Sequence, residues 1–267
     1  MALVGFTIIR NNFKFDYLLR EAVGSVLPVV DRHIIVECFS EDDTYAEVCQ
    51  MKQENPKIMV LRHPWGKHFT ILQQVANFAT SYVRPGDWFF QIQADEVMHE
   101  DSLPVLEALP RLLQDNGAVA ARPHYWHFMG NYSTEFDFMY RHKLVFAQQG
   151  HGWTWDGDAC QLMNGQGRMA DVGIEVFHYG KVHEAKKALE KEQAFQSMYE
   201  EAGLGFPDPK LRQMQETIGE MDYLYLFEAA IEAGQAREFT GTHPAIMKER
   251  IEKAKQEGWE QWERQMA

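Results

Sequence analysis

The chain of 267 residues has no long uninterrupted hydrophobic run, although 45% of its residues are hydrophobic. A transmembrane helix needs roughly 20 consecutive apolar residues, and every apolar run in this sequence is interrupted well before that length. The apolar start at residues 3–9 has no basic residue before it and ends at Arg10, which is not the pattern of a secretory signal sequence. The sequence therefore predicts a protein with no segment inserted in a membrane.

Cysteine and basic residues are also scarce. The three cysteines, Cys38, Cys49 and Cys160, form no CxxC pair and cannot all pair with one another, which favours a reducing, cytoplasmic location. Lys and Arg together number 26 against 39 Asp and Glu, which gives a formal net charge of −13. Because a general grip on a nucleic-acid backbone needs excess positive charge, this composition argues against nucleic acid as a partner.

A glycine-rich GxGxxG loop is missing after the first apolar run, which argues against a NAD-linked oxidoreductase. The first half instead alternates strand-like and helical segments. Apolar runs typical of strands lie at residues 3–9, 33–39, 57–61 and 87–93, with helical periods at residues 16–27, 40–53 and 69–83, the first capped by Asp16. This alternation predicts an α/β fold in which right-handed crossovers build a mostly parallel central sheet flanked by helices.

The pattern changes beyond Gly117. Longer and more aromatic strands are predicted at residues 118–132, 138–147 and 171–180, with a glycine-rich polar segment at residues 148–168. Residues 184–267 have helical periodicity and many Glu and Lys residues, which we interpret as the solvated faces of a helical C-terminal region. Such helices could also join two copies of the chain in a homo-oligomer.

Four polar loops follow the four predicted strands of the first half. They are RNN at residues 10–12, SEDDT at 40–44, HPWGKH at 63–68 and ADE at 94–96. Taken singly, each loop fits ordinary turn and capping chemistry. Because the carboxyl ends of parallel strands meet at one edge of a sheet, and ligands bind at that edge, the four loops together predict a binding site.

The last of these loops places Asp95 and Glu96 directly after an apolar strand. Burying a carboxylate is costly unless a cation pairs with it, so these two side chains either face solvent or hold a cation. His99 and Glu100, and Glu96 as well, also suit the capping or flanking of a helix that begins near Ser102.

Several segments, taken in order, resemble the family 2 type of nucleotide-sugar glycosyltransferases on the glycosyltransferase-A fold. They are GFTIIRN at residues 5–11, SEDDT at 40–44, QADEVMHE at 93–100 and FHYG at 177–180. The likeness is to a bacterial-type subgroup with an IRN start, a QADE strand end and an HYG triplet, and it covers about residues 3–183. It implies a Rossmann-like catalytic domain at residues 1–183, with a nucleotide-binding half (1–100), an acceptor-side half (101–183) and a separate C-terminal region (184–267).

The resemblance implies a nucleoside-diphosphate-sugar donor, with UDP favoured, a divalent cation, and a sugar or other hydroxyl-bearing acceptor. Asp95 matches the metal-binding aspartate of the family's Asp-x-Asp motif, whereas Gln93 replaces the first aspartate and removes one anionic ligand. His178 matches a later metal ligand, and its imidazole favours Mn²⁺ over Mg²⁺. The alternative for His178 is an ordinary core histidine. A bound cation would stabilise the negative charge of the departing diphosphate.

The nucleotide contacts implied by the resemblance come from the same loops. Asp43 matches an aspartate that family members place against the base or ribose, with helix capping by Asp42 or Asp43 as the alternative. The remaining candidates for nucleotide binding are Arg10, Asn11, Trp65, Lys67 and Gln93, with His68 beside them. Among these, an aromatic ring can stack on the base and a cationic side chain can meet phosphate.

An inverting transfer needs a base that accepts the proton of the attacking hydroxyl. The resemblance implies a carboxylate in the acceptor-side half, where WDGDAC offers Asp158, which we prefer, and Asp156; Asp137 and Glu135 are rivals. The aromatic residues Trp126, Tyr132, Trp153 and Trp155 could stack on an acceptor sugar or equally pack in the core.

Two other functions fit the same residues. One is a non-catalytic scaffold of the same fold that binds nucleotide, because Gln93 weakens the metal motif. The other is a metal-dependent hydrolase that would use Asp95, Glu96 and His178 to activate water.

Overall fold

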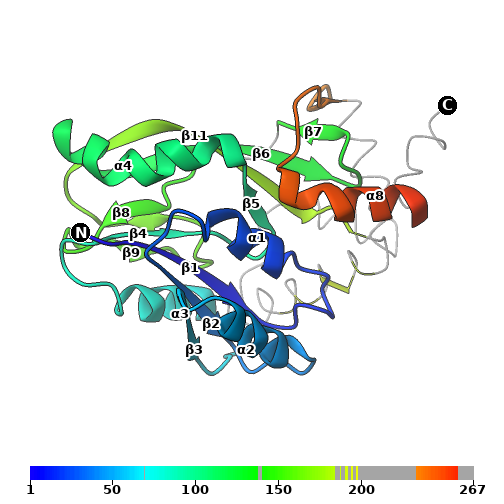
Figure 1. Cartoon of the computed structure of the whole chain (residues 1–267), viewed down its shortest axis with the longest axis horizontal. Coiled ribbons are helices and arrows are strands. Elements are labelled where there is room, and N and C mark those ends of the chain that lie inside the picture. Colours follow the sequence, from blue (N-terminus) through cyan, green and yellow to red (C-terminus); the bar gives the residue numbers. More distant parts are fainter. Residues whose placement is uncertain are drawn as a thin grey trace.

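The computed structural model describes residues 1–68, 70–137, 140–183, 187, 190, 191, 194, 197 and 233–257. Its strands form one large sheet and a separate two-stranded sheet. Figure 1 shows these elements along the chain. Among the described residues, no helix has the length and apolar character needed to cross a membrane.

The first half of the chain confirms the predicted α/β alternation. Its strands are β1 (Leu3–Ile9), β2 (Arg32–Glu37), β3 (Ile58–Arg62) and β4 (Trp88–Gln91), and its helices are α1 (Leu19–Val26), α2 (Thr44–Glu54) and α3 (Ile71–Thr80). β1 pairs in parallel with both β2 and β4, and β2 pairs in parallel with β3. The carboxyl ends of all four strands therefore lie at one edge of the sheet, as the sequence predicts.

The first helix starts later than predicted, and Asp16 is not its cap. α1 begins at Leu19, whereas Asp16 lies outside it with a φ of 53°. The Asp16 carboxylate instead forms an ion pair with Arg250 of the C-terminal helix, in which Arg250 Nη2 and Asp16 Oδ2 are 2.6 Å apart. Burial opposes this charge, but the contacts with His183 and Arg250 lower the pKa of Asp16 to about 2. A tertiary partner has replaced the local capping role.

The second half adds mostly antiparallel pairs around two long parallel strands. Its elements are β5 (Glu96–Met98), η1 (Glu100–Ser102), α4 (Leu103–Asp115), β6 (Ala118–Met129), β7 (Thr134–Phe136), β8 (Phe146–Gln148), β9 (Thr154–Trp155), β10 (Leu162–Met163), β11 (Arg168–Lys181), β12 (Ala236–Glu238), η2 (Ala245–Met247) and α8 (Lys248–Glu257). β11 runs parallel to β6 and antiparallel to β5. The order in the large sheet is β12-β7-β6-β8-β4-β1-β2-β3, with β11 pairing to β5 and β6, and β9 and β10 form the separate two-stranded sheet. The predicted strands at 118–132 and 171–180 are confirmed. Most of the predicted 184–267 helical region lies outside the described residues.

The strand predicted at residues 138–147 is largely wrong. In its described part only β8, from Phe146, is a strand inside that range, and residues 143–145 have no regular structure. Lys143 explains the difference, because its side chain is 1% exposed and its ammonium is bonded to Glu96. Turning this side chain inward prevents the regular alternation that a strand requires.

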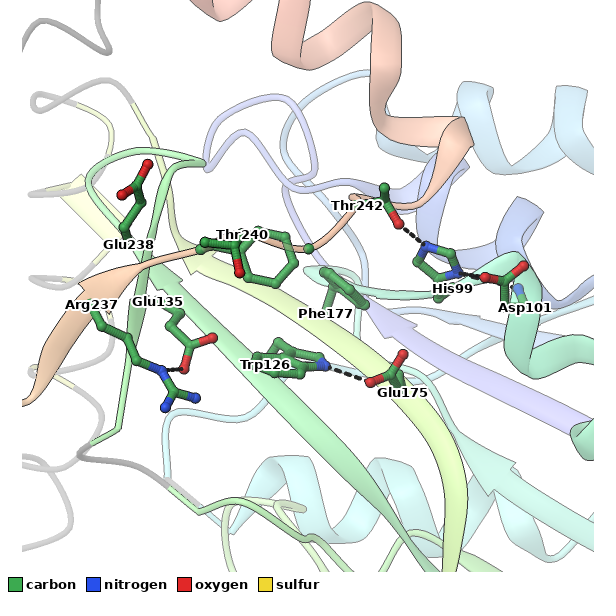
Figure 2. Close-up of a pocket in the computed structure, with 12 residues that line it drawn as sticks. His99, Asp101, Trp126, Glu135, Glu175, Phe177, Arg237, Glu238, Thr240 and Thr242 are labelled. Atoms are coloured by element: carbon green, nitrogen blue, oxygen red, sulfur yellow. Dashed lines mark hydrogen bonds and ion pairs between the residues drawn. The ribbon is translucent and has the colours of Figure 1, made fainter.

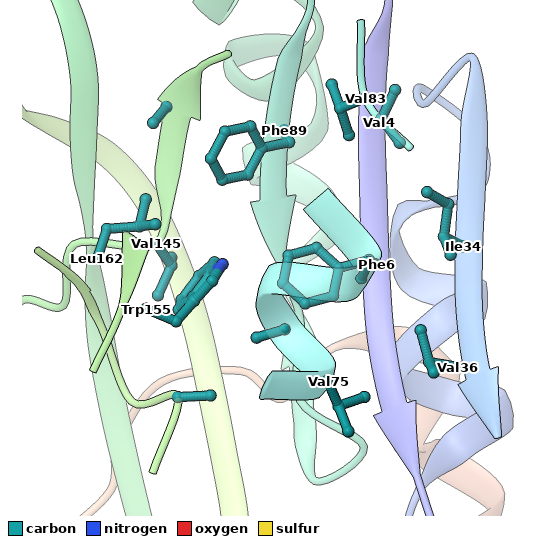
Figure 3. Packing of buried hydrophobic residues seen from close by; sticks show 14 of the residues in the cluster. Val4, Phe6, Ile34, Val36, Val75, Val83, Phe89, Val145, Trp155 and Leu162 are labelled. Carbon is teal, nitrogen blue, oxygen red and sulfur yellow. The ribbon is translucent and has the colours of Figure 1, made fainter. Parts of the chain in front are cut away.

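Helices cover both faces of the sheet (Figure 1). Apolar residues of α1, α2 and α4 pack on one face, while α3 and the β9–β10 hairpin pack on the other. On that second face Trp155 lies edge-on to Phe6, with ring centroids 5.4 Å apart. Figure 3 shows this packing between β1, α3 and the hairpin. The buried indole of Trp155, the first residue of WDGDAC, therefore anchors that segment to the nucleotide-binding half.

A buried ion pair lies beneath the edge of the sheet where the loops meet. Glu96 is fully buried and holds Lys143, and its second oxygen accepts the backbone N–H of Gln93 at 2.9 Å. Glu96 N also donates to Gln93 O at 3.0 Å. Glu96 is therefore not the helix-flanking residue predicted from sequence. Its carboxylate accepts the Gln93 N–H and so closes the 93–96 turn.

We expect removal of one partner of this pair to destabilise the protein severely, because the other charge is left buried without compensation. Glu96→Gln and Lys143→Met should each lower the free energy of unfolding by about 3–5 kcal/mol, as measured by urea denaturation. The double variant should lose much less than the sum of the two single losses. The exposed pair Arg122–Asp171 is the matched control, and Asp171→Asn should cost about 0–1 kcal/mol. Additive losses at Glu96 and Lys143 would contradict the pairing.

Candidate active site

Asp95 lies at the end of the 93–96 turn, facing the carboxyl end of β11. Its backbone carbonyl accepts the N–H of Tyr179 at 2.8 Å, which ties the turn to β11. The residue is only 8% exposed. Asp95 and Glu96 are therefore neighbouring carboxylates that are both buried, with their side chains committed to different partners.

His178 and Gly180 of the HYG triplet converge on Asp95. His178 Nε2 lies 3.9 Å from Asp95 Oδ1. A Cβ added to Gly180 would lie 2.5 Å from His178 Nε2 and 2.8 Å from Asp95 Oδ2, closer than real contacts allow. The glycine thus leaves open the small space on which the carboxylate and the imidazole both border.

A chain of hydrogen bonds orients the His178 ring. His127, opposite His178 in the β6–β11 register, has Nε2 2.7 Å from the carbonyl oxygen of Tyr140 and Nδ1 3.0 Å from His178 Nδ1. Burial lowers the pKa of both imidazoles, that of His127 to about 4, so both are neutral near pH 7. Since a carbonyl only accepts, His127 donates from Nε2 and accepts at Nδ1, and His178 donates from Nδ1. We infer that His178 Nε2 carries the lone pair and presents it toward Asp95.

These two donors suit a divalent cation with few protein ligands. Carboxylate oxygen and neutral imidazole nitrogen are both ligands of Mn²⁺. Across the described part of the chain, no cluster of three or more His, Cys, Asp or Glu side chains could hold a metal ion. Asp95 and His178 would therefore supply two ligands, and phosphate oxygens of a nucleotide would have to complete the shell.

Lys191 is a functional candidate that the sequence analysis missed. It lies in the Glu- and Lys-rich stretch interpreted as a solvated face, yet it is 7% exposed. Its ammonium donates to Asp95 Oδ2 at 2.8 Å and to Gly180 O at 3.0 Å. Burial alone would raise the pKa of Asp95, but the Lys191 charge holds it well below its usual value. The solvated-face interpretation is therefore wrong at this residue, and periodicity alone gave no sign of it.

The loops after β1, β2 and β3 meet as predicted. Arg10 Nη2 donates to Glu41 at 2.6 Å, and its guanidinium lies over the Trp65 ring, 5.6 Å from the centroid. Asn11 is fully buried, and its side-chain oxygen accepts the N–H of Glu41 at 2.8 Å. Asn11 thus joins the first two loops, while Arg10 and Trp65 form a partly exposed cationic and aromatic surface above them. Lys67 is exposed beside this surface and Gln93 is half-buried.

The two aspartates of SEDDT have separate roles. Asp42 accepts the backbone N–H groups of Phe13 and Lys14 at 3.0 and 2.9 Å and that of Thr44 at 3.1 Å, so it fixes the loop after β1. Asp43 occupies the cap position of α2, but its side chain makes no capping hydrogen bond and is exposed. The capping alternative for Asp43 is therefore wrong, and its carboxylate remains available to a ligand.

Glu37 and Arg62 form a further link at this edge that the sequence analysis did not single out. Glu37 ends β2, is fully buried, and accepts Arg62 Nε at 2.8 Å and Ser40 N at 2.6 Å. The Arg62 guanidinium also stacks over the rings of Phe39 and Tyr45. A charged residue at the end of an apolar strand could have indicated this pair.

The structure brings Asp156 and Asp158 together in one turn. Asp156 Oδ1 accepts the N–H of Gln161 at 3.1 Å, and Asp158 Oδ1 accepts that of Cys160 at 2.9 Å. Burial, reinforced by the charge of Asp158, raises the pKa of Asp156 to about 6. A carboxylate with a pKa near 6, beside a second carboxylate, is suited to proton transfer near neutral pH.

The rival carboxylates are engaged in ion pairs. Asp137 pairs with Arg141 at 2.6 Å, and Glu135, which is 3% exposed, pairs with Arg237. Each carboxylate is thus held by a guanidinium, and that of Arg141 lowers the pKa of Asp137.

The four predicted acceptor aromatics have different positions. Tyr132 and Trp155 are 2% and 1% exposed and belong to the core, whereas Trp153 is half-buried. Trp126 lines a cavity of about 450 Å³ together with Phe177, Phe239 and the carboxylates of Glu135 and Glu175. Figure 2 shows Trp126 beside Phe177, with its indole N–H directed at Glu175. Because side chains alternate along a strand, this cavity lies on the opposite face of β6 and β11 from His127 and His178.

No protein-family model and no curated protein sequence matches the chain. It is similar in structure to residues 1–349 of S. aureus TarS, with a TM-score of 0.45 and 8% identity over 74% of this chain and 70% of that one. It is also similar to GalNAc-T7 with UDP, GalNAc and Mn²⁺ (TM-score 0.46, 13% identity, 85% of this chain and 56% of that one). A third similar structure is glucosyl-3-phosphoglycerate synthase from Mycobacterium tuberculosis with Mn²⁺, UDP and phosphoglyceric acid (TM-score 0.46, 12% identity, 78% and 80%). Likenesses at this level assign neither a family nor an activity to the chain.

We expect Gly180→Ala to disrupt the meeting of Asp95 and His178, because the new Cβ would overlap both side chains. Forcing them apart should lower the free energy of unfolding by about 1–3 kcal/mol in urea denaturation. Gly173→Ala on the same strand is the matched control, since a Cβ there meets nothing within 4 Å. Equal stability of the two variants would show that the space at Gly180 is not constrained.

Proposed function

We propose that the protein is a nucleotide-sugar glycosyltransferase of the glycosyltransferase-A type, which moves a sugar from a nucleoside diphosphate, with UDP favoured, to an acceptor hydroxyl. The observation that carries the proposal is the convergence of Asp95 Oδ and His178 Nε2 at the Gly180 space. Asp95 belongs to the QADE segment and His178 to the HYG triplet, so two of the segments that carry the family resemblance meet in space. It also lies at the sheet edge where ligands of parallel α/β folds bind.

In this proposal the polar loops hold the donor. Asp43 meets the ribose or base, and Trp65 stacks on the base while Arg10 and Lys67 face the phosphates, with Asn11 and Gln93 lining the floor. A divalent cation, Mn²⁺ or Mg²⁺, would be held by Asp95 and His178 and would neutralise charge on the departing diphosphate. Gln93 adds no anionic ligand, so the cation depends on these two side chains and on the nucleotide.

The carboxylate pair Asp156 and Asp158 would accept the proton of the attacking hydroxyl, with Asp158 as the preferred base. In an inverting transfer the hydroxyl oxygen bonds to the anomeric carbon while the bond to the diphosphate breaks and the proton passes to the carboxylate. The Trp155 anchor and the bond from Gln73 Nε2 to Trp155 O, 2.7 Å long, fix the turn that carries this pair.

One experiment separates this proposal from its main alternative. Thermal melting with UDP, GDP, ADP and NAD, each with and without MnCl₂, should show stabilisation by a nucleoside diphosphate of about 2.7 kcal/mol at 100 times its Kd. Release of that nucleotide from its sugar in the presence of an acceptor hydroxyl should follow. Nucleotide binding without sugar transfer would favour the non-catalytic scaffold. Gln93, which stands in place of the first aspartate of the Asp-x-Asp motif, also favours that alternative. Stabilisation by NAD alone would reject the proposal.

We expect Asp95→Asn to lower kcat at least tenfold, equivalent to about 1.4 kcal/mol, because the cation and the leaving group lose their carboxylate. Asp43→Ala should instead raise the donor KM and spare kcat, since a contact with base or ribose is equally present before and during transfer. Steady-state kinetics on variants checked by melting distinguish the two. A pure kcat effect at Asp43, or normal turnover in the Asp95 variant, would contradict these roles.

We expect the transfer rate to fall as the pH drops below about 6, because the pKa of Asp156 is raised to about 6 and a protonated Asp156 would hydrogen-bond to the proposed base, Asp158. Asp158→Asn should lower kcat by roughly 10² to 10⁴. Asp156→Asn should retain most of the rate and lose the fall near pH 6, since the group that titrates there is gone. A large loss only in the Asp156 variant would transfer the base role to that residue.

A further inference from the structure

Several contacts hold the Lys191 ammonium at the proposed cation site. It donates to Asp95 Oδ2 at 2.8 Å and to Gly180 O at 3.0 Å, and it lies 4.4 Å from the centroid of the Tyr17 ring. His183 Nε2 is 3.4 Å from the same nitrogen. A lysine that is 7% exposed and bonded in this way is placed at the site by the fold, unlike a surface side chain that happens to reach it.

Three carboxylates described near this position are each already paired with a basic side chain. Asp95 is neutralised by Lys191, Glu96 is paired with Lys143, and Asp16 is paired with Arg250. His178 and His183 border the site as imidazoles. A divalent ion placed against Asp95 would therefore face a buried ammonium across one carboxylate, and like charges at such short range in a buried site repel strongly.

We propose that Lys191 is the built-in counter-ion of Asp95 and competes directly with a divalent cation for its carboxylate. This inference rests on the proposed function, because it assumes the cation site at Asp95 and His178. Free Mn²⁺ binds weakly while Lys191 holds Oδ2, and it binds well when Lys191 withdraws or when diphosphate oxygens bring further negative charge. The nucleotide therefore promotes binding of the metal ion at Asp95.

The first test measures Mn²⁺ binding without nucleotide, from the electron paramagnetic resonance of free aqueous Mn²⁺. Lys191→Met removes the competing charge and keeps an apolar stem of similar length, so the Kd for Mn²⁺ should fall at least about tenfold relative to the unaltered chain. Lys187→Met is the matched control, because Lys187 is 39% exposed and faces Asp16, 3.9 Å away. The control variant should bind Mn²⁺ as the unaltered chain does.

The double variant Lys191→Met with Asp95→Asn locates the gained site. Its Mn²⁺ affinity should return to that of the unaltered chain if the gain is at Asp95. Persistence of tight binding in the double variant would place the ion elsewhere and overturn the proposal. Equal or weaker Mn²⁺ binding in a folded Lys191→Met variant would overturn it as well.

A second measurement uses the unaltered chain, so it does not depend on any variant folding. Acetic anhydride should modify Lys191 several-fold faster when MnCl₂ and UDP are both present than in buffer alone, as measured by mass spectrometry of proteolytic peptides, because displacement exposes its amine. Lys187 serves as the internal reference. Unchanged modification of Lys191 would overturn the competition.

These readouts require no sugar transfer. Competition at Asp95 without any transfer of sugar would remove the transferase assignment and leave the inference about Lys191 intact. Metal-stimulated transfer with unchanged Mn²⁺ binding in the Lys191 variant would do the reverse.

Discussion

The buried ion pair between Glu96 and Lys143 is the constraint on which the candidate site depends. Glu96 closes the 93–96 turn through the Gln93 backbone and holds the fully buried ammonium of Lys143. That turn fixes the direction of the Asp95 side chain. Because an isolated buried charge is so costly, the pair couples the nucleotide-binding half to the irregular segment before β8 and makes the position of Asp95 depend on both.

Two adjacent carboxylates therefore have opposite electrostatic environments. Burial is the largest influence on each, but Lys191 and nearby groups lower the pKa of Asp95, whereas the pKa of Glu96 is raised. Asp95 borders the open Gly180 space, and Glu96 has no contact with solvent. The question that the QADE segment raises, whether its carboxylates face solvent or hold a cation, has the same answer for both residues. Each holds a lysine, and only Asp95 is placed where a ligand could reach it.

Local patterns predicted the elements more reliably than their ends. Apolar runs gave all four parallel strands of the first half. β1, β2 and β4 are buried along nearly their whole length and read as continuous apolar runs, whereas the edge strand β3 is only partly buried. Local patterns failed at residues 138–147, where Lys143 turns inward, and at Asp16, where a distant arginine replaced a local capping role. In both cases a charged side chain pairs with a residue distant in sequence, and neither propensity nor periodicity predicts such a pair.

The sequence by itself determined the α/β class and the edge at which the loops meet, because the alternation of strands and helices and the positions of the loops follow from short-range patterns. The candidates Asp95, His178, Asp156 and Asp158 came from the family resemblance. Only the tertiary structure decided which of these side chains touch. The tautomer chain from Tyr140 through His127 to His178, the space left by Gly180, and the ammonium of Lys191 on Asp95 all join segments that are far apart in sequence. The physical reason is that hydrogen bonds and ion pairs are fixed by distances of a few ångströms, which are set by packing of the whole sheet and not by the identity of neighbouring residues.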